Sequence, residues 1–478
     1  MRRTYPPGPK VNFLLAVISQ LASRWLPFDP LEFNLTLARD FGDVAYYQIG
    51  PLRVYQLNHP DLARQILVEQ PEKFHKPRLI KNAFRPFAGN GLLTSDGALW
   101  KQQRKLIQPA FHQRHLSTYA DVMIAHTQRM VDGWRDGEVR EISSEMTKLT
   151  LGIVVKSLFG ADVSRQADEV GTLMAAVLDA ANQRLNSVVR VPDWVPTARN
   201  LREWRAVRKL DVILDEMIRA RRQSSDADSG DLLSALLTAV DADDGTRMTD
   251  RQLRDEMMTL FMAGHETTAM ALVWTWYLLA RHREVAARLA GELQQALRGR
   301  APTLADLARL PYTEMVVREA MRLYPPAPGF TREPIEDVTI GGYEVPKGSL
   351  VTVITWALHR DPRFFPDPER FDPERFGPGW EERVPRFAYL PFGGGPRVCI
   401  GNGFAMMEAR LIVATVAQRY RLQLEPDQEV VPIQLVTVRP KDGIRMRIRG
   451  PDAGSSDVFQ TTWRGADRER SGSNRESM

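Results

Sequence analysis

Phe392-Gly-Gly-Gly-Pro-Arg-Val-Cys-Ile-Gly401 is the stretch that decides the fold of this 478-residue chain, and it holds the only cysteine, Cys399. Three glycines and a proline predict a tightly turned loop with little side-chain bulk. Residues 404–414 are rich in strong helix formers, so Cys399 should lie where a loop enters a helix N-terminus. Unpaired N–H groups there favour an anion. We therefore expect a lowered thiol pKa and a thiolate that can bind a metal.

A lone cysteine is more often a small buried apolar residue than a ligand. It could also be a catalytic nucleophile, although no partner histidine can be assigned from the sequence. The loop favours a ligand, because Phe-x-x-Gly-x-Arg-x-Cys-x-Gly, from Phe392 to Gly401, resembles the haem-binding loop of the cytochrome P-450 family. In that family the cysteine thiolate is the proximal ligand of the haem iron. The resemblance therefore implies haem b bound through Cys399.

The resemblance also implies a mostly α-helical fold with a smaller β region. In that fold the haem lies between a long central helix and the helix that follows the cysteine. Length alone would allow about three domains. No linker separates them, however, and the resemblance implies a single haem domain over residues 1–449. Residues 450–478 turn to Gly, Ser, Asp and Arg, which predicts a disordered tail.

The composition narrows the partners and the compartment. The net charge of +5 and the pI near 9.2 would suit an acidic partner. No dense basic run with interleaved aromatic residues indicates nucleic acid. The apolar stretch 13–18 is too short to span a bilayer, so we expect no transmembrane anchor. One cysteine excludes intramolecular disulfides and fits a reducing cytosol, so we expect a cytoplasmic protein. We also expect it to be a monomer.

A second motif lies in a long helix that a capping box at Thr249 predicts, running to about His282. Its middle, residues 263–268, reads Ala-Gly-His-Glu-Thr-Thr, which is costly in an apolar helix unless it has a function. The alternative is a kinked core helix whose polar groups are satisfied internally. The motif matches the family's oxygen-binding groove. The resemblance makes Thr267 the hydroxyl that steadies dioxygen and Glu266 the acid that feeds the proton relay.

Trp100 and Arg104 lie one turn apart in a basic helix, where charges usually form a solvated face. The spacing places both on one side and resembles the family's pair that holds a haem propionate. By the same resemblance Arg332 and Arg397 contact propionates, and Phe392 belongs to the haem-binding loop.

Glu319 and Arg322 lie on a helix predicted at 312–324. An i,i+3 pair is normally a surface salt bridge worth little, but the apolar residues around this one favour burial. Arg375, in Pro373-Glu-Arg-Phe376, completes the match to the family's Glu-Arg-Arg network. The role that this implies is structural and not catalytic.

Residues 84–95, rich in aromatic and small residues, predict a loop ahead of the helix with Trp100. If Trp100 holds a propionate, this loop passes the haem edge, so Phe87 is our leading substrate-contact candidate. Phe84 competes with it, and the alternative is that either ring packs in the core. The remaining candidates for substrate contact are Ala263, Ala327 and Pro328.

Together the motifs imply a haem-thiolate monooxygenase that inserts one oxygen atom of dioxygen into a small apolar substrate by hydroxylation or epoxidation. Residues 84–95 and 263–268 look similar to bacterial fatty-acid hydroxylases, which favours a fatty acid or another lipophilic compound. No flavin-binding segment follows, so we expect electrons from a separate ferredoxin or flavodoxin with its reductase. The alternatives are a peroxide-driven oxygenase or isomerase on the same scaffold, and a haem sensor or electron-transfer protein.

Overall fold

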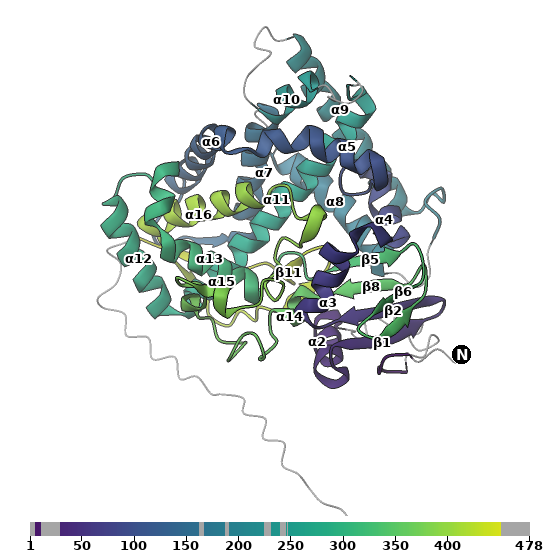
Figure 1. Ribbon diagram of the computed structural model, residues 1–478. Helices are drawn as coiled ribbons and strands as arrows, with labels where there is room; N and C mark the ends of the chain where they lie inside the picture. The colour runs from purple at the N-terminus through teal and green to yellow at the C-terminus, as the bar shows by residue number, and fades with distance from the viewer. Residues whose placement is uncertain are drawn as a thin grey trace, which may run out of the picture.

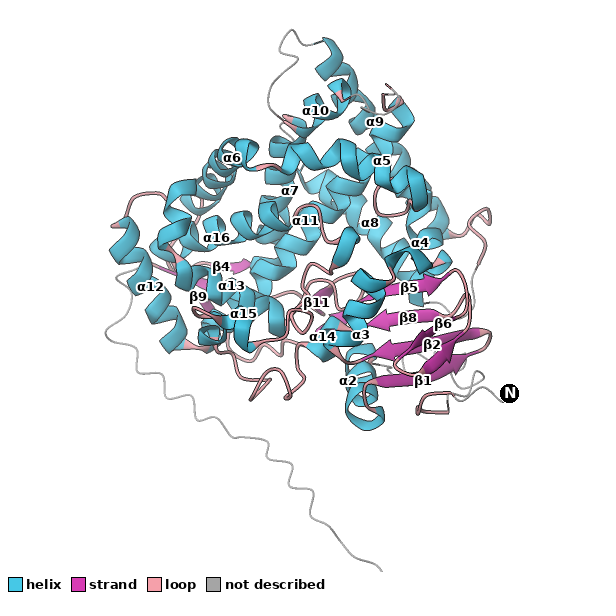
Figure 2. Ribbon diagram, viewed as in Figure 1, coloured by secondary structure: helices cyan, strands magenta, loops and turns pink. Residues whose placement is uncertain are grey.

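A computed structural model describes residues 5–10, 29–161, 167–186, 191–223, 231–239, 245 and 247–450. Helices fill most of the molecule, and the strands of the larger sheet gather at one side, as Figures 1 and 2 show. The predicted mostly α-helical chain with a smaller β region is confirmed. The predicted tail, from residue 451 on, and the apolar stretch 13–18 lie outside the described residues. Within the described ranges, no helix combines the length and the apolar character needed to cross a membrane.

The helices run from single turns to the 32 residues of α11, which passes through the centre of the molecule (Figure 1). The α-helices are α2 (Pro30–Phe41), α3 (Pro60–Arg64), α4 (Arg78–Ala88), α5 (Gly97–Ile107), α6 (Gln113–Asp132), α7 (Ile142–Phe159), α8 (Ala167–Asn186), α9 (Ala198–Gln223), α10 (Leu232–Thr238), α11 (Asp250–Arg281), α12 (Arg283–Leu297), α13 (Pro311–Leu323), α14 (Thr355–Leu358), α15 (Trp380–Arg383) and α16 (Asn402–Arg419). The shorter 3₁₀ or π turns are η1 (Gln65–Glu69), η2 (Pro71–Lys73), η3 (Gln108–Phe111), η4 (Leu304–Arg309), η5 (Pro373–Phe376) and η6 (Gly395–Arg397).

The strands form one larger sheet and smaller ribbons. The five-stranded sheet has the order β1-β2-β8-β5-β3. Its hairpin of β1 and β2 turns at Gly50-Pro51, as the alternating pattern of 44–58 predicts. β2 pairs in parallel with β8, about 300 residues later, so both parts of the chain build one layer. The strands are β1 (Val44–Ile49), β2 (Leu52–Leu57), β3 (Phe74–His75), β4 (Val139–Glu141), β5 (Phe330–Pro334), β6 (Val338–Ile340), β7 (Tyr343–Val345), β8 (Leu350–Val353), β9 (Arg421–Leu424), β10 (Pro432–Gln434), β11 (Val438–Pro440) and β12 (Arg445–Arg449).

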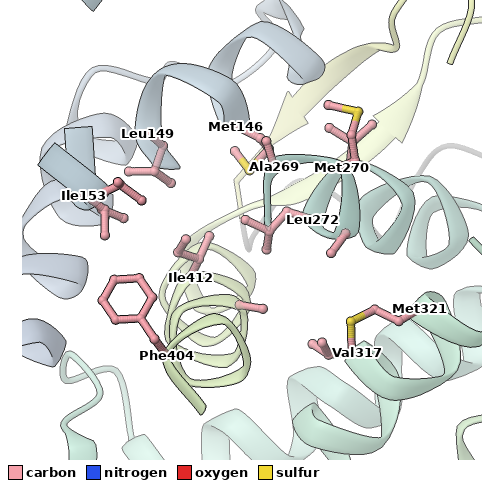
Figure 3. Close-up of a cluster of buried hydrophobic side chains, with 14 of the residues drawn as sticks. Met146, Leu149, Ile153, Ala269, Met270, Leu272, Val317, Met321, Phe404 and Ile412 are labelled. Atoms are coloured by element: carbon pink, nitrogen blue, oxygen red, sulfur yellow. The ribbon is translucent and has the colours of Figure 1, made fainter. Parts of the chain in front are cut away.

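The core is built around α11, whose side chains meet those of α7, α13 and α16 in Figure 3. Thr249 caps its first turn in the predicted capping box with Gln252, and the helix ends at Arg281, as expected. Residues 268–279 are all buried, which explains why this part of the helix is apolar on every side rather than along one stripe. The indole of Trp274 donates a hydrogen bond of 2.9 Å to the carbonyl of Val438, which ties α11 to β11.

One prediction about local structure was wrong. The predicted loop 84–95 begins five residues later, because α4 continues through Phe84 and Phe87 to residue 88. The apolar side chains at 80, 83, 84 and 87 follow the i, i+3, i+4, i+7 spacing of a buried helix face. Burial of that face outweighs the backbone hydrogen bond that Pro86 cannot donate. The helix ends at Gly89, which has a φ of +52°.

Candidate functional site

The cysteine loop is closed by a hydrogen bond of 3.0 Å from the amide of Cys399 to the carbonyl of Phe392. Gly395 has a φ of +68°, and a Cβ atom there would lie 1.9 Å from the carbonyl oxygen of Leu67. Only glycine fits a left-handed position that another backbone approaches so closely. The loop is therefore braced against η1, and Cys399 stands three residues before α16 begins.

The predicted lowering of the thiol pKa is not what the structure shows. Burial raises the pKa of Cys399, and it outweighs the opposite effects of the Gly401 amide and the nearby Arg104 guanidinium. The residue is exposed, so the sulfur can be reached, yet enough protein surrounds it to disfavour the bare charge. The helix N-terminus alone does not ionise this thiol. A metal ion that binds the sulfur displaces its proton, because only the thiolate is a ligand.

Arg104 joins α5 to the cysteine loop. Its guanidinium donates a hydrogen bond of 2.8 Å to the carbonyl of Val398, the residue before the cysteine. Burial lowers the pKa of Arg104, and Cys399 acts in the opposite direction, which shows that the two side chains are neighbours. The hydrogen bond of Arg104 thus leads to the loop, and its expected contact with a propionate stays a prediction.

Arg332 and Arg397 belong to a cationic cluster with Lys76 and Lys81. Burial lowers the pKa of Arg332 to about 10, and the charge of Arg397 adds to this effect. Burial and the same two arginines lower the pKa of Lys76 to about 7. Such mutual repulsion in a half-buried place is costly unless an anion compensates it.

One carboxylate pairs with this cationic cluster, and a second lies next to it. Asp96 pairs with Arg397 and, at 2.7 Å, with Lys81. Glu333 lies beside His75 instead, with 3.7 Å between the carboxylate and the imidazole. Four cationic side chains therefore exceed two carboxylates, an excess that suits a ligand with two carboxylate groups.

Trp100 lies at the same place but holds a partner that the sequence did not suggest. The guanidinium of Arg397 stacks over the indole ring, 4.3 Å from its centroid. Arg397 also donates a hydrogen bond of 3.2 Å to the carbonyl of Ser95. Lys76 was not among the predicted site residues, because a single lysine before Pro77 carries no pattern. Its place beside the arginines depends on tertiary structure, because Lys76 directly follows β3, which pairs with β5.

The motif 263–268 leaves part of the middle of α11 accessible. Ala263 is exposed and Thr267 half-buried, whereas residues 255–262 and 268–279 are all buried. Residues four apart lie on one helix face, so this accessible surface is one spot between the two packed stretches of the helix. The Thr267 hydroxyl donates a hydrogen bond of 2.8 Å to the Ala263 carbonyl. Its oxygen keeps lone pairs that can accept a hydrogen bond from a molecule at this spot.

Glu266 points away from that spot. It is 8% exposed, and its carboxylate accepts a hydrogen bond of 2.7 Å from the hydroxyl of Thr437. On the other side of α11, a Cβ atom at Gly264 would lie 3.0 Å from Val154, so the helix packs closely on α7 there. The alternative of a core helix with satisfied polar groups therefore describes Glu266, whereas Ala263 and Thr267 face accessible space.

Glu319 and Arg322 are both 0% exposed. Two hydrogen bonds, of 2.6 and 2.8 Å, join the carboxylate to the guanidinium in a bidentate pair. The guanidinium also donates to the carbonyls of His359 and Pro368, at 2.8 and 2.7 Å. Arg375 approaches the same carboxylate at 3.3 Å. The contacts of the expected Glu-Arg-Arg network are therefore present. They connect α13 to the long irregular segment before the cysteine loop.

The substrate-contact candidates differ in how far their side chains are exposed. Phe87 is 0% and Phe84 6% exposed, and the two rings lie edge to face with centroids 5.7 Å apart. This packing favours the alternative that both rings belong to the core. Pro328 is buried, whereas Ala327, like Ala263, is exposed. Leu93, which sequence reasoning passed over, is half-buried on the loop after α4.

The donor set fits a haem. Cys399 offers one thiolate ligand, and the part of the chain that the structure describes contains no group of three or more His, Cys, Asp or Glu side chains able to hold a metal ion. A single protein ligand suits a metal that brings its other ligands within a prosthetic group. The cationic cluster suits the two propionates of haem, and the glycine-rich loop leaves room for a flat macrocycle.

Comparison with known proteins agrees with this geometry. A family model described as Cytochrome P450 matches residues 6–447. The chain is 39% identical over 398 residues to cyclooctat-9-en-7-ol 5-monooxygenase of Streptomyces melanosporofaciens, covering 83% of this chain and 86% of that protein. It is 35% identical over 424 residues to pentalenene oxygenase of Streptomyces avermitilis, covering 88% of this chain and 92% of that protein.

A solved structure shares the architecture. The crystal structure of the cytochrome P450DA heme domain superposes with a TM-score of 0.84 at 29% sequence identity. The match covers 94% of this chain and 98% of that one. The arrangement of α11, α16 and the cysteine loop is therefore that of a haem domain.

Proposed function

The chain belongs to the cytochrome P450 family, and on that premise we propose that it oxidises a cyclic terpenoid. It is a haem-thiolate monooxygenase with haem b as its cofactor. The observation that carries the substrate class is its similarity to two enzymes whose names specify terpenoid substrates, cyclooctat-9-en-7-ol and pentalenene.

The accessible residues of the site support a broad rather than a thin substrate. Ala263 and Ala327 have the smallest side chains that could line a pocket, and both are exposed. Small side chains leave width for a fused ring system, and apolar ones suit a hydrocarbon. The fatty acid that the sequence favoured would need length more than width. It is compared directly in the experiment below.

We assign the residues as follows. Cys399 ligates the iron, and Arg332, Arg397 and Lys76 of the cationic cluster neutralise the propionates. When bound, the haem supplies the oxidation of an unactivated carbon by dioxygen and two electrons. Thr267 offers its hydroxyl oxygen at the accessible spot on α11 and holds a proton that it donates to the Ala263 carbonyl.

Glu266 is the proton reservoir beside that hydroxyl. Its buried carboxylate is held by Thr437 and must turn towards Thr267 to deliver a proton. A pair of this kind is needed when dioxygen is reduced, because protons must reach it from outside the apolar pocket. The relay supports the monooxygenase over a haem sensor or an electron-transfer protein, which needs none.

Electrons come, in this proposal, from a separate ferredoxin or flavodoxin with its reductase. We propose a monomer in the cytoplasm, where such donors and a single free cysteine are compatible.

The test is a binding and turnover screen of the purified haem-loaded protein. We expect pentalenene or cyclooctat-9-en-7-ol to shift the haem spin state at lower concentration than palmitic acid or testosterone does. A surrogate ferredoxin and reductase should then give a product with one atom of ¹⁸O from ¹⁸O₂. A spin shift with palmitic acid alone would replace the terpenoid by a fatty acid. Turnover with hydrogen peroxide but not with dioxygen and the donor would favour the peroxide-driven alternative.

A further inference from the structure

Two carboxyl groups at the start of α11 hold the loop that follows α4. The amide of Asn90 donates a hydrogen bond of 2.9 Å to Asp255, and the amide of Leu92 donates one of 2.9 Å to Glu256. Between these amides, Gly91 packs so closely that a Cβ atom would lie 2.2 Å from the hydroxyl of Thr259. The loop therefore rests on α11 through its backbone, at a separation that only glycine allows.

This contact lies on the same face of α11 as the accessible spot at Ala263 and Thr267. Glu256 precedes Ala263 by seven residues, about two turns, which brings it back to nearly the same angle about the helix axis. The rise between the two residues is about 10 Å along the helix. Leu93, the neighbour of the bonded Leu92, is half-buried. The loop thus lies about two turns from Ala263 along the same face of α11.

Glu256 is unusual for a residue that only fills space. It is 0% exposed, and one carboxylate oxygen has no hydrogen-bond partner within the described part of the chain. Burial, with a smaller effect of the neighbouring Asp255, raises its pKa to about 8. The neighbouring carboxylate of Asp255 is itself paired with Arg254, 3.0 Å away. A buried, neutral acid that binds one backbone amide is a costly arrangement that a leucine would avoid.

The other end of the loop is tied to the proposed haem contacts. Lys76 donates a hydrogen bond to the carbonyl of Leu93, and Arg397 donates one to the carbonyl of Ser95. Gln103 of α5 donates a hydrogen bond of 2.7 Å to the carbonyl of Asn90. Both ends of the loop are fixed in this way. The hydrogen bond from the Leu92 amide to Glu256 therefore sets the position of Leu93 relative to α11.

We propose that Glu256 is a positioning residue for the substrate, which fixes Leu93 through the amide of Leu92 and so sets which carbon is oxidised. This inference rests on the proposed function, since it assumes that a substrate lies at Ala263. Glu256 touches neither the substrate nor the haem, and it acts only through the loop.

The experiment compares Glu256→Gln, Glu256→Leu and a control, Val273→Ala, in the haem-loaded protein. Gln keeps an acceptor for the Leu92 amide, whereas Leu removes it. Val273 is 0% exposed on the far half of α11, so its truncation lowers stability without touching the loop. Hydrogen exchange is measured in the segment 89–96, and the product ratio is measured with whichever compound is turned over.

We expect exchange at the Leu92 amide to rise about tenfold in Glu256→Leu, since one hydrogen bond of the closed loop is lost. The product ratio should change in the same variant. Glu256→Gln should keep both the protection and the ratio, and Val273→Ala should keep the ratio. Native exchange in Glu256→Leu, or an unchanged ratio despite faster exchange, would overturn the proposal.

A second readout separates this proposal from the proposed function. The dissociation constants of 4-phenylimidazole and of the much bulkier clotrimazole need only the haem and the pocket. If no terpenoid is bound but the ratio of these constants changes several-fold in Glu256→Leu and not in Glu256→Gln, the proposed substrate fails while the positioning role stands. If terpenoids are oxidised and neither ratio responds, the positioning role fails alone.

Discussion

The hydroxyl of Thr437 donates a hydrogen bond of 2.7 Å to the carboxylate of Glu266, which lies 171 residues earlier in the chain. This bond holds the acid on the buried side of α11, next to a hydroxyl on the accessible side. Adjacent helix positions differ by about 100°, so Glu266 and Thr267 point in different directions. In the proposed relay, proton delivery therefore requires the acid to leave Thr437, and the lifetime of that bond would limit the relay.

Thr267→Ala should still bind haem and substrate but lose coupling between reductant and product. The accessible hydroxyl disappears, and relays of this kind contribute about 10²–10⁴-fold to rate. Hydrogen peroxide released per reductant consumed should rise sharply. Thr268→Ala is the matched control, because its hydroxyl bonds the Gly264 carbonyl and the residue is 4% exposed. Full coupling in Thr267→Ala would remove the assignment.

Cys399→Ser should lose the strongly red-shifted absorption band of the reduced, carbon-monoxide-bound haem. The band depends on a thiolate ligand, and the chain has only one cysteine. A serine hydroxyl is about the same size, so the loop with its bond from the residue 399 amide to Phe392 should remain. Circular dichroism serves as the folding control. An unchanged band would exclude Cys399 as the ligand.

Glu319→Ala should fail to give folded, haem-loaded protein. Arg322 would be left fully buried without its counter-charge, at a cost of about 3–5 kcal/mol against a total stability of about 5–15 kcal/mol. The control is Asp168→Ala, which breaks an exposed pair with Lys148 and should cost at most about 1 kcal/mol. Normal yield and haem content for Glu319→Ala would show that the network is dispensable.

Phe87→Ala should lower stability by about 3–5 kcal/mol and leave the product ratio unchanged, because the ring is fully buried against Phe84. Leu93→Ala should instead change the product ratio and cause only a small change in melting temperature. Chemical denaturation and product analysis are made on both variants. A changed ratio in Phe87→Ala at nearly normal stability would restore that ring as a substrate contact.

Glu256→Gln should change how stability depends on pH. In the folded chain the pKa of Glu256 is about 8, against an ordinary value of 4.5. Between these values the folded state holds a proton that the unfolded state has released, so the wild type loses stability from this group as the pH rises. The melting temperature of Glu256→Gln should gain on the wild type by about 2–5 °C from pH 5 to pH 8. Parallel melting curves over that range would contradict the raised pKa.

The sequence predicted what depends on local pattern. The capping box at Thr249, the limits of α11 and the hairpin at Gly50-Pro51 follow from short-range chemistry, and each is present. Continuation of α4 through Phe84 and Phe87 was missed, since the aromatic and small residues of 84–95 favoured a loop. There the burial of Phe84 and Phe87 decided the outcome.

The site was harder to predict where it depends on packing. The helix N-terminus predicted an anionic Cys399, but the protein around the sulfur raises the thiol pKa. Desolvation depends on elements far away in the sequence, and a pattern of ten residues does not report it. Lys76 and Leu93 were missed for the same reason. Each gains its place from strands or loops that meet only in the folded chain.

If the cationic cluster of Lys76, Lys81, Arg332 and Arg397 binds the haem propionates as proposed, the supply of cofactor helps to set how much of the protein survives in the cell. Like charges that repel one another in a half-buried site favour opening of the chain, and a dicarboxylate that binds only the folded form reverses this by mass action. Chains made faster than haem is supplied should therefore be cleared by proteases. The yield of enzyme should then follow the haem supply more closely than it follows transcription.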